Sequence, residues 1–204
     1  MKPETGNNSL AAQTEKVSVR IESGGHSFSS DTLPPKVLQA AEAEFCVVTD
    51  KTVLVPDEAF DPESAERWLA VSGLACNDDE RPLCVSRNGV TAIMAVARQC
   101  SAAIGREFGQ RAHFTTPLLE EYDSEGRKLH IRTIGQVSYF KLYENGRLRF
   151  AEALKTESPG DILYYMHKID GRFGLDAYHI YIYGEGAAGT RKVLKKYFNR
   201  VKCE

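Results

Sequence analysis

The sequence predicts a mixed fold of α-helices and β-strands, arranged in two halves that repeat one plan. Short runs of alternating apolar and polar residues occur in both halves, and turn residues such as Asn-Gly separate them, as in β-hairpins. Each half then passes from strands into segments whose apolar residues recur at helical spacing. With 204 residues, 42% of them hydrophobic, the chain is long enough to form one domain or two small ones.

The first half is predicted to contain mainly short strands. We expect them at residues 16–22, 26–29, 44–49, 52–55, 83–86 and 90–96. Residues 23–25, 50–51 and 88–89 are predicted to be tight turns that join consecutive pairs of these strands. Asp61 followed by Pro62 is typical of a helix start, and the helix should end near Gly73. A second helix is expected at residues 98–108.

The second half repeats this order. Strands are expected at residues 128–134, 137–143 and 147–154, with turns at 135–136 and 144–146. Ser158 can cap a helix that has Pro159 in its first turn, Asp161 at its positive end, and an apolar face down to Gly171. A strand at 178–183 and a helix at 190–201 complete the prediction.

The predicted organisation is a disordered tail at residues 1–13, a first half at 14–124 and a second half at 125–204. The tail is polar and lacks the apolar centre of a signal peptide. The boundary falls in the polar stretch 123–127.

Composition restricts the classes of partner and compartment. The 26 basic and 28 acidic residues nearly cancel, so bulk charge does not direct the chain to nucleic acid or to an anionic membrane. Five scattered cysteines without a C-x-x-C pair argue against a disulfide framework and favour a reducing cytoplasm. We expect Cys84 and Cys100 to lie in the core. No apolar segment is long enough for a membrane span.

The sequence offers no catalytic nucleophile and no metal site. Its five histidines lack metalloprotease spacing and neighbouring cysteines, and neither a P-loop nor a serine-hydrolase elbow occurs. Tyrosines are expected to pack in the core or cap strand edges, and only an exposed cluster of them would indicate a binding surface. Those concerned are Tyr139, Tyr143, Tyr164, Tyr165, Tyr181 and Tyr183.

The most distinctive motif is a glycine loop between the last strand and the last helix. Gly184, Gly186 and Gly189 spell the G-x-G-x-x-G pattern of dinucleotide-binding proteins. A complete βαβ unit and its acidic ribose partner would need more residues than follow, so we do not expect a Rossmann domain. The glycines can serve positive φ angles and close packing, or they can contact a nucleotide. Glu185 can approach a ribose or a metal, or it can be solvated.

Several segments resemble a bacterial domain-of-unknown-function family with an actin-like ATPase fold. They are residues 17–21, Leu54-Val55-Pro56, 143–148, 158–165 and 181–185, and the similarity spans residues 17–198. The resemblance implies two ribonuclease-H-like halves, each with a mixed sheet and flanking helices, with nucleotide held between them. It implies an architecture and not a role.

The resemblance also implies three nucleotide loops, which can be compared with this sequence. The first phosphate loop corresponds to the turn around Ser23 and Gly24, and Arg20 stands where an aspartate is expected, with Glu22 nearby but out of register. The second corresponds to Gly135 and Gln136, and Thr133 replaces its aspartate. The adenosine loop corresponds to Gly184, Glu185, Gly186 and Gly189.

Phosphoryl transfer depends on Mg²⁺, which carboxylates normally anchor, so the loss of both acids predicts the loss of hydrolysis. Our leading hypothesis is therefore a non-hydrolysing, cytoplasmic actin-like protein that acts by binding a protein partner, as a scaffold or within an assembly. The alternative is a weak ATP-binding switch that keeps contacts at the three loops. A nucleic-acid-associated module is a third reading, suggested only by the ribonuclease-H-like halves and by basic residues near the C-terminus.

Overall fold

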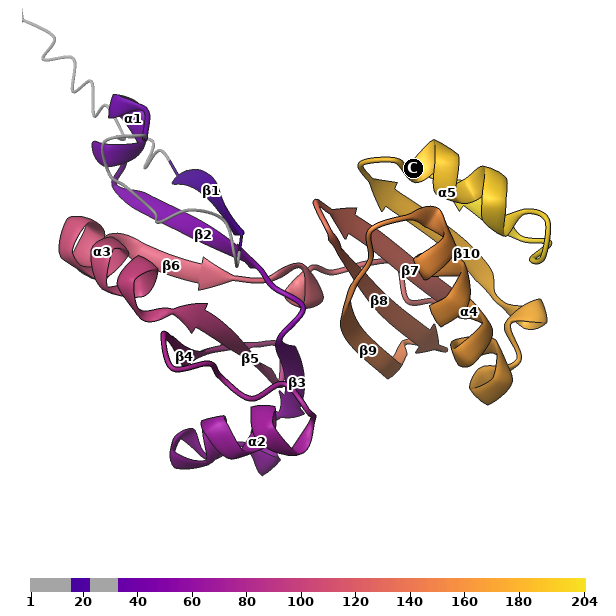
Figure 1. Cartoon of the computed structure of the whole chain (residues 1–204), viewed down its shortest axis with the longest axis horizontal. Coiled ribbons are helices and arrows are strands. Elements are labelled where there is room, and N and C mark those ends of the chain that lie inside the picture. Colours follow the sequence, from indigo (N-terminus) through magenta and orange to yellow (C-terminus); the bar gives the residue numbers. More distant parts are fainter. Residues whose placement is uncertain (1–15, 23–32) are drawn as a thin grey trace, which may run out of the picture.

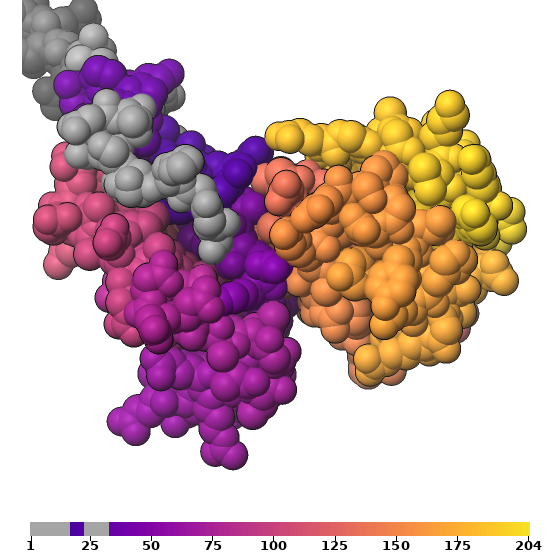
Figure 2. Space-filling model, in the orientation of Figure 1, coloured from indigo at the N-terminus to yellow at the C-terminus, as the bar shows by residue number. Residues whose placement is uncertain are grey.

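The computed structural model describes residues 16–22 and 33–204, which form two lobes (Figure 1). The expected tail, the 23–25 turn and the 26–29 strand lie outside the described residues. The first lobe holds two three-stranded sheets, ordered β1-β2-β6 and β3-β5-β4, and the second lobe holds one five-stranded sheet, ordered β11-β10-β7-β8-β9. The indigo-to-magenta and orange-to-yellow parts meet over a limited region in the space-filling view (Figure 2).

The first lobe combines a parallel and an antiparallel sheet. Strands β1 (Lys16–Glu22), β2 (Glu42–Val48) and β6 (Ala112–Thr115) run parallel. Phe45 on β2 is fully buried against α3, where Ile104 and Phe108 belong to the same core cluster. The helices are α1 (Pro35–Leu38), α2 (Ala65–Val71) and α3 (Arg98–Phe108).

The antiparallel sheet of this lobe contains β3 (Thr52–Pro56), β4 (Glu80–Arg87) and β5 (Val90–Ala97). The β4–β5 hairpin and α3 are confirmed as predicted. The expected pairing across residues 50–51 is wrong, because β2 and β3 join different sheets. Cys84 is exposed on β4, contrary to expectation, whereas Cys100 is buried.

The second lobe has a three-stranded antiparallel meander at its centre. Strands β7 (Arg127–Ile134), β8 (Val137–Glu144) and β9 (Arg147–Lys155) pair as predicted. Strand β10 (His179–Gly184) adds to β7 in parallel, and β11 (Val201–Cys203) adds to β10 in parallel. Helices α4 (Pro159–Phe173) and α5 (Ala187–Leu194) pack on one face of this sheet (Figure 1).

Helix α4 begins with the predicted capping box. The Ser158 hydroxyl accepts a hydrogen bond from the backbone N–H of Asp161, and the Asp161 carboxylate accepts one from the backbone N–H of Ser158. The helix passes Gly171 and ends at Phe173, where Gly174 adopts the left-handed conformation.

The predicted helix at residues 190–201 is wrong at both ends. Helix α5 starts earlier, at Ala187, and ends at Leu194. The chain then returns to the sheet, where the Arg200 carbonyl accepts a hydrogen bond from Ile180 N–H and Val201 begins β11. Pairing with the open edge of β10 therefore competes successfully with the helical pattern, and Phe198 still reaches the core.

The lobes contact each other through a small apolar cluster and a buried hydroxyl. The cluster joins Val48 and Leu118 to Ile134 and Ala153. At its centre, the Tyr139 hydroxyl accepts a hydrogen bond from Thr49 N–H (3.0 Å) and donates one to the Thr49 carbonyl (3.3 Å). The connecting chain includes the 3₁₀ turn Pro117–Leu119 and contains the predicted division after residue 124, which stays a prediction.

None of the helices formed by residues 16–22 and 33–204 combines the length and the apolar character needed to cross a membrane.

Candidate functional site

Two of the predicted loop regions and the end of β1 converge where the two lobes face each other. The Gly135–Gln136 turn follows β7 and the Gly184–Gly186 loop follows β10, and these neighbouring strands are parallel, so both loops lie at the same end of the sheet. The end of β1 approaches both loops. Arg20 Nη1 lies 3.4 Å from Glu185 Oε1, and a Cβ atom on Gly135 would lie 3.5 Å from Glu22 Oε1.

The predicted site residues of the Gly135–Gln136 turn and the Gly184–Gly186 loop are therefore brought together, and Gly189 follows within α5. Glu22 does not align in sequence with the aspartate that the resemblance implies, but its side chain reaches the Gly135 turn directly. Ser23 and Gly24 follow Glu22 in the chain and lie outside the described residues. The pairing of Arg20 with Glu185 was not predicted, because nothing in the local sequence links residues 165 positions apart.

The three glycines of the last loop have different structural roles. Gly184 has φ +91°, and a Cβ atom there would collide with the Thr133 carbonyl oxygen on the neighbouring strand. Gly186 has φ +69° and precedes α5, with open space around it. Backbone conformation and packing explain these two residues. Gly189 lies within α5 with neither a positive φ nor a close neighbour, so the fold alone does not require glycine there.

A chain of hydroxyl groups supports the Gly135–Gln136 turn. Thr133 Oγ1 lies 2.9 Å from Ser138 Oγ, which lies 2.7 Å from Thr156 Oγ1. The backbone N–H of Thr156 donates to the Gln136 carbonyl at 2.8 Å. Ser138 and Thr156 are buried. Thr133 is thus a neutral, hydrogen-bonded residue at the position where the resemblance implies an acid.

The charged side chains beside these loops are two carboxylates and one guanidinium. Glu22 and Glu185 bring carboxylates to the loops, and Arg20 pairs with Glu185 in an exposed contact of the kind that contributes little to stability. A carboxylate beside the Gly135 turn repels a phosphate group. Within the described part of the chain, no three His, Cys, Asp or Glu side chains are grouped so that they could hold a metal ion.

A thiol near these loops does not supply a nucleophile. Cys46 lies on β2 opposite Arg20 of β1. Burial, and next the negative charge of Glu120, raise the pKa of Cys46 to about 11. The thiol therefore stays protonated near neutral pH, and a protonated thiol is a poor nucleophile.

A cavity of about 340 Å³ lies between the lobes and is lined by Leu54, Asn88, Glu120, Tyr122, Lys141 and Tyr143, among others. Lys141 is almost fully buried there. Its ammonium group donates to the Glu120 carbonyl at 2.6 Å and lies 5.6 Å from the ring centres of Tyr122 and Tyr143. Burial lowers the pKa of Lys141 to about 8.

Sequence reasoning missed this lysine although the pattern held a signal. In β8, Lys141 alternates with Tyr139 and Tyr143, so all three side chains lie on one face of the strand. A lysine flanked in this way indicates a charged group held among aromatic rings.

The comparisons with known proteins agree with this architecture. The family described as "Protein of unknown function (DUF3822)" matches residues 41–201. No curated protein matches the chain. A Bacteroides thetaiotaomicron protein of unknown function with an actin-like ATPase fold superimposes with a TM-score of 0.69 at 14% identity, covering 82% of this chain and 70% of that one.

Two further solved structures are more distant. A PilM–PilN type IV pilus biogenesis complex gives a TM-score of 0.47 at 13% identity, over 81% of this chain and 70% of that one. The cytoplasmic domain of EpsL, an inner-membrane component of the Vibrio cholerae type II secretion system, gives 0.39 at 9% identity, over 81% and 80%. At these identities the similarity shows the fold alone, and the actin-like ATPase fold rests on the Bacteroides protein.

Proposed function

Because the chain belongs to the family described as "Protein of unknown function (DUF3822)" and has an actin-like ATPase fold, we propose that it is a cytoplasmic binding protein that does not hydrolyse nucleotide. It would act on a protein partner, as a scaffold or as part of a larger assembly.

One observation carries this proposal: neither position implied for a magnesium-anchoring acid holds a carboxylate. Arg20 occupies the first and is paired with Glu185, and Thr133 occupies the second and is bonded to Ser138. Phosphoryl transfer needs a divalent cation that neutralises charge on the β- and γ-phosphates. A guanidinium and a hydroxyl cannot anchor that cation as carboxylates do.

Glu22 does not substitute for the missing pair. Its carboxylate lies against the Gly135 turn, where phosphate oxygens would have to approach backbone N–H groups. Its charge would oppose that approach unless a cation intervened, and a single acid from β1 leaves the second lobe without a matching ligand at Thr133. The expected consequence is that these loops form a structural contact between the lobes and do not hold a hydrolysable nucleotide.

Phosphate release from ATP in the presence of Mg²⁺ tests the proposal. We expect a rate equal to the spontaneous one, both for the protein and for the Arg20→Ala variant. Release above background that follows protein concentration, and that disappears in Glu22→Gln, would show that this acid does support hydrolysis and would refute the proposal.

The weak ATP-binding switch remains the second candidate, and the unexplained glycine at position 189 favours it. Calorimetry with ATP and Mg²⁺ separates the two candidates. Gly189→Tyr places bulk beside the loop without backbone strain, whereas any side chain at Gly186 is strained. Saturable binding that Gly189→Tyr abolishes and Gly189→Ala retains would establish the switch. The absence of saturable heat supports the binding protein without nucleotide.

A further inference from the structure

The face of the second sheet opposite α4 and α5 carries aromatic and cationic side chains side by side. Leu129 and Ile131 of β7 and Ile180 and Ile182 of β10 point into the core beneath the helices. Their strand neighbours therefore point to the other face. We call this second surface the ladder face, and its members come from β7, β8, β10 and β11.

Strand register arranges these side chains in rows across the sheet. One row runs Lys202, Tyr181, His130, Lys141, and the next runs His179, Lys128, Tyr143. The His130 ring stacks on Tyr181, with centroids 5.2 Å apart and planes within 13°. Lys202 Nζ lies 5.8 Å from the centre of the Tyr181 ring. The first row thus places two stacked rings between two lysines, and the second places a lysine between two rings.

The chain itself already covers part of the ladder face with an acidic segment, Glu120–Asp123. The Glu120 carboxylate lies 3.1 Å from Arg132 Nη1, and the Tyr122 ring stacks on His130 at 4.7 Å. The Asp123 carboxylate pairs with Lys128, and the Asp123 carbonyl accepts a hydrogen bond from His130 Nε2 at 2.9 Å. Glu120, Tyr122 and Asp123 thus each meet a complementary group of the face, whereas the Glu121 carboxylate accepts a hydrogen bond from Asn88 of the first lobe.

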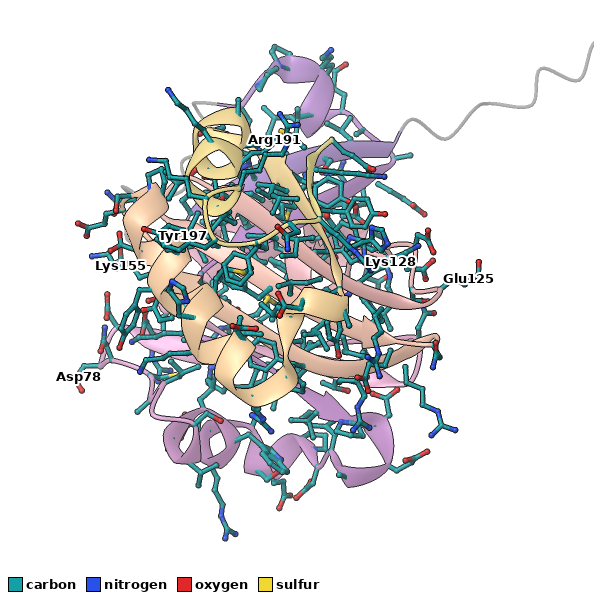
Figure 3. All side chains as sticks on the ribbon, turned by 90° about the vertical axis from the view of Figure 1, so that its right-hand side faces the viewer. Asp78, Glu125, Lys128, Lys155, Arg191 and Tyr197 are labelled. Atoms are coloured by element: carbon teal, nitrogen blue, oxygen red, sulfur yellow. The ribbon has the colours of Figure 1, made fainter. Side chains whose placement is uncertain are left out.

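The rest of the ladder face is open. It borders a cavity of about 610 Å³ whose lining includes Glu125, Arg127, Lys128, His179, Tyr181 and Arg200. Arg200 and Lys202 are exposed, and Tyr181 and His179 are half-buried. In Figure 3, Lys128 and Glu125 lie at the opposite edge of the second lobe from Tyr197 and Lys155. The helices therefore do not cover this side.

We propose that the open part of the ladder face binds a short acidic peptide segment that contains an aromatic residue, contributed by a protein partner. The partner segment would continue the arrangement of Glu120–Asp123, placing its ring against Tyr181 and its carboxylates beside Lys128, Arg200 and Lys202. This inference rests on the proposed function in that the partner is a protein.

Two features favour a peptide over single-stranded nucleic acid, which also uses stacking and basic residues. The face already binds an acidic peptide within the same chain, so the new contact extends an existing interface. The near-neutral net charge of −2 also provides no extended positive field for a polyanion that spans many phosphates.

The test uses the full chain and a fluorescein-labelled peptide that repeats Glu-Glu-Tyr-Asp twice. Fluorescence anisotropy should show saturable binding that weakens as salt is raised. Arg200→Glu should weaken it by about tenfold or more, because it reverses a charge in the site. Lys192→Glu, an identical charge change on α5 and away from the face, should leave affinity within about twofold.

Peptide controls test the chemistry of recognition. Replacing the tyrosines by alanine, or the acids by their amides, should each weaken binding, because ring and charge contribute separately. Tyr181→Ala should abolish the advantage of the tyrosine peptide over the alanine peptide. If Tyr181→Ala does not fold, the Arg200→Glu and Lys192→Glu pair still decides the matter, since Arg200 is exposed.

Several outcomes would overturn the inference: no saturable binding, equal losses in Arg200→Glu and Lys192→Glu, or binding of oligo(dT) in place of the peptide. The last would assign the face to nucleic acid.

The experiments distinguish failure of this inference from failure of the proposed function. ATP hydrolysis would refute the proposed function whether or not the peptide binds. Absence of peptide binding, together with absence of hydrolysis, would refute only this inference.

Discussion

At the scale of single residues, glycines of one motif differ in what they do for the fold. Gly184→Ala should destabilise the protein by about 2–4 kcal/mol, because it combines a positive φ with a collision against Thr133. Gly189→Ala should stabilise it by up to about 1 kcal/mol, since the position is helical and open. Urea unfolding of both variants measures the difference. Equal effects would show that the loop is not packed as described.

The buried histidine His130 should make stability depend on pH. Burial lowers the pKa of His130 below its ordinary value of 6.5, and nearby Lys128 acts in the same direction. The unfolded chain therefore binds a proton at a higher pH than the folded one, so stability should fall as pH drops below about 6.5 and level off below the folded-state pKa.

Unfolding free energies at pH 7.5 and 5.5 measure this dependence. The loss at the lower pH should be smaller in His130→Gln than in the wild type. His113→Gln, which changes an exposed histidine, should leave the loss unchanged. An identical loss in wild type and His130→Gln would mean that other groups cause it.

At the scale of elements, the capping box of α4 is the clearest local signal. Ser158→Ala removes the hydroxyl that accepts from Asp161 N–H and should cost about 1 kcal/mol. Ser158→Thr retains a hydroxyl acceptor and should cost less. Thermal unfolding by circular dichroism compares the two, and an alanine variant as stable as the wild type would show that the cap contributes nothing.

Elements were predictable wherever local chemistry decides them. The Asn88-Gly89 hairpin, α3 and the start of α4 follow from turn residues, apolar spacing and caps. The pairing of β2 and β3 was mispredicted because Asp50-Lys51 resembles a hairpin turn, while β5 and β6 recruit the two strands into separate sheets. The end of α5 was predicted too late in the chain because apolar residues continue at helical spacing beyond Leu194. In the structure, Val201 pairs with the edge of β10.

The candidate site was predictable only in part for the same reason. Each loop could be recognised from its glycines, and the resemblance grouped them. The contacts of Arg20 with Glu185 and of Glu22 with the Gly135 turn depend on how two lobes come together, which no local pattern encodes.

At the scale of the whole molecule, Tyr139 couples the two lobes. Tyr139→Phe leaves the buried N–H of Thr49 without its hydroxyl partner and should cost about 1–3 kcal/mol. Because this bond joins the lobes, the variant should also unfold less cooperatively, with tryptophan fluorescence from Trp68 in the first lobe and circular dichroism giving separate midpoints. Tyr164→Phe, at an exposed tyrosine, should match the wild type in both respects.

The order of strands in the first lobe has a consequence for how the chain acquires its structure. Strand β6 pairs with β2, yet the entire β3-β5-β4 sheet lies between them in the sequence. Closing so long an intervening stretch is entropically costly unless it has already become compact. The inserted sheet should therefore form early and the parallel sheet late. Pulsed hydrogen exchange during refolding would accordingly protect the amides of β4 and β5 before those of β6.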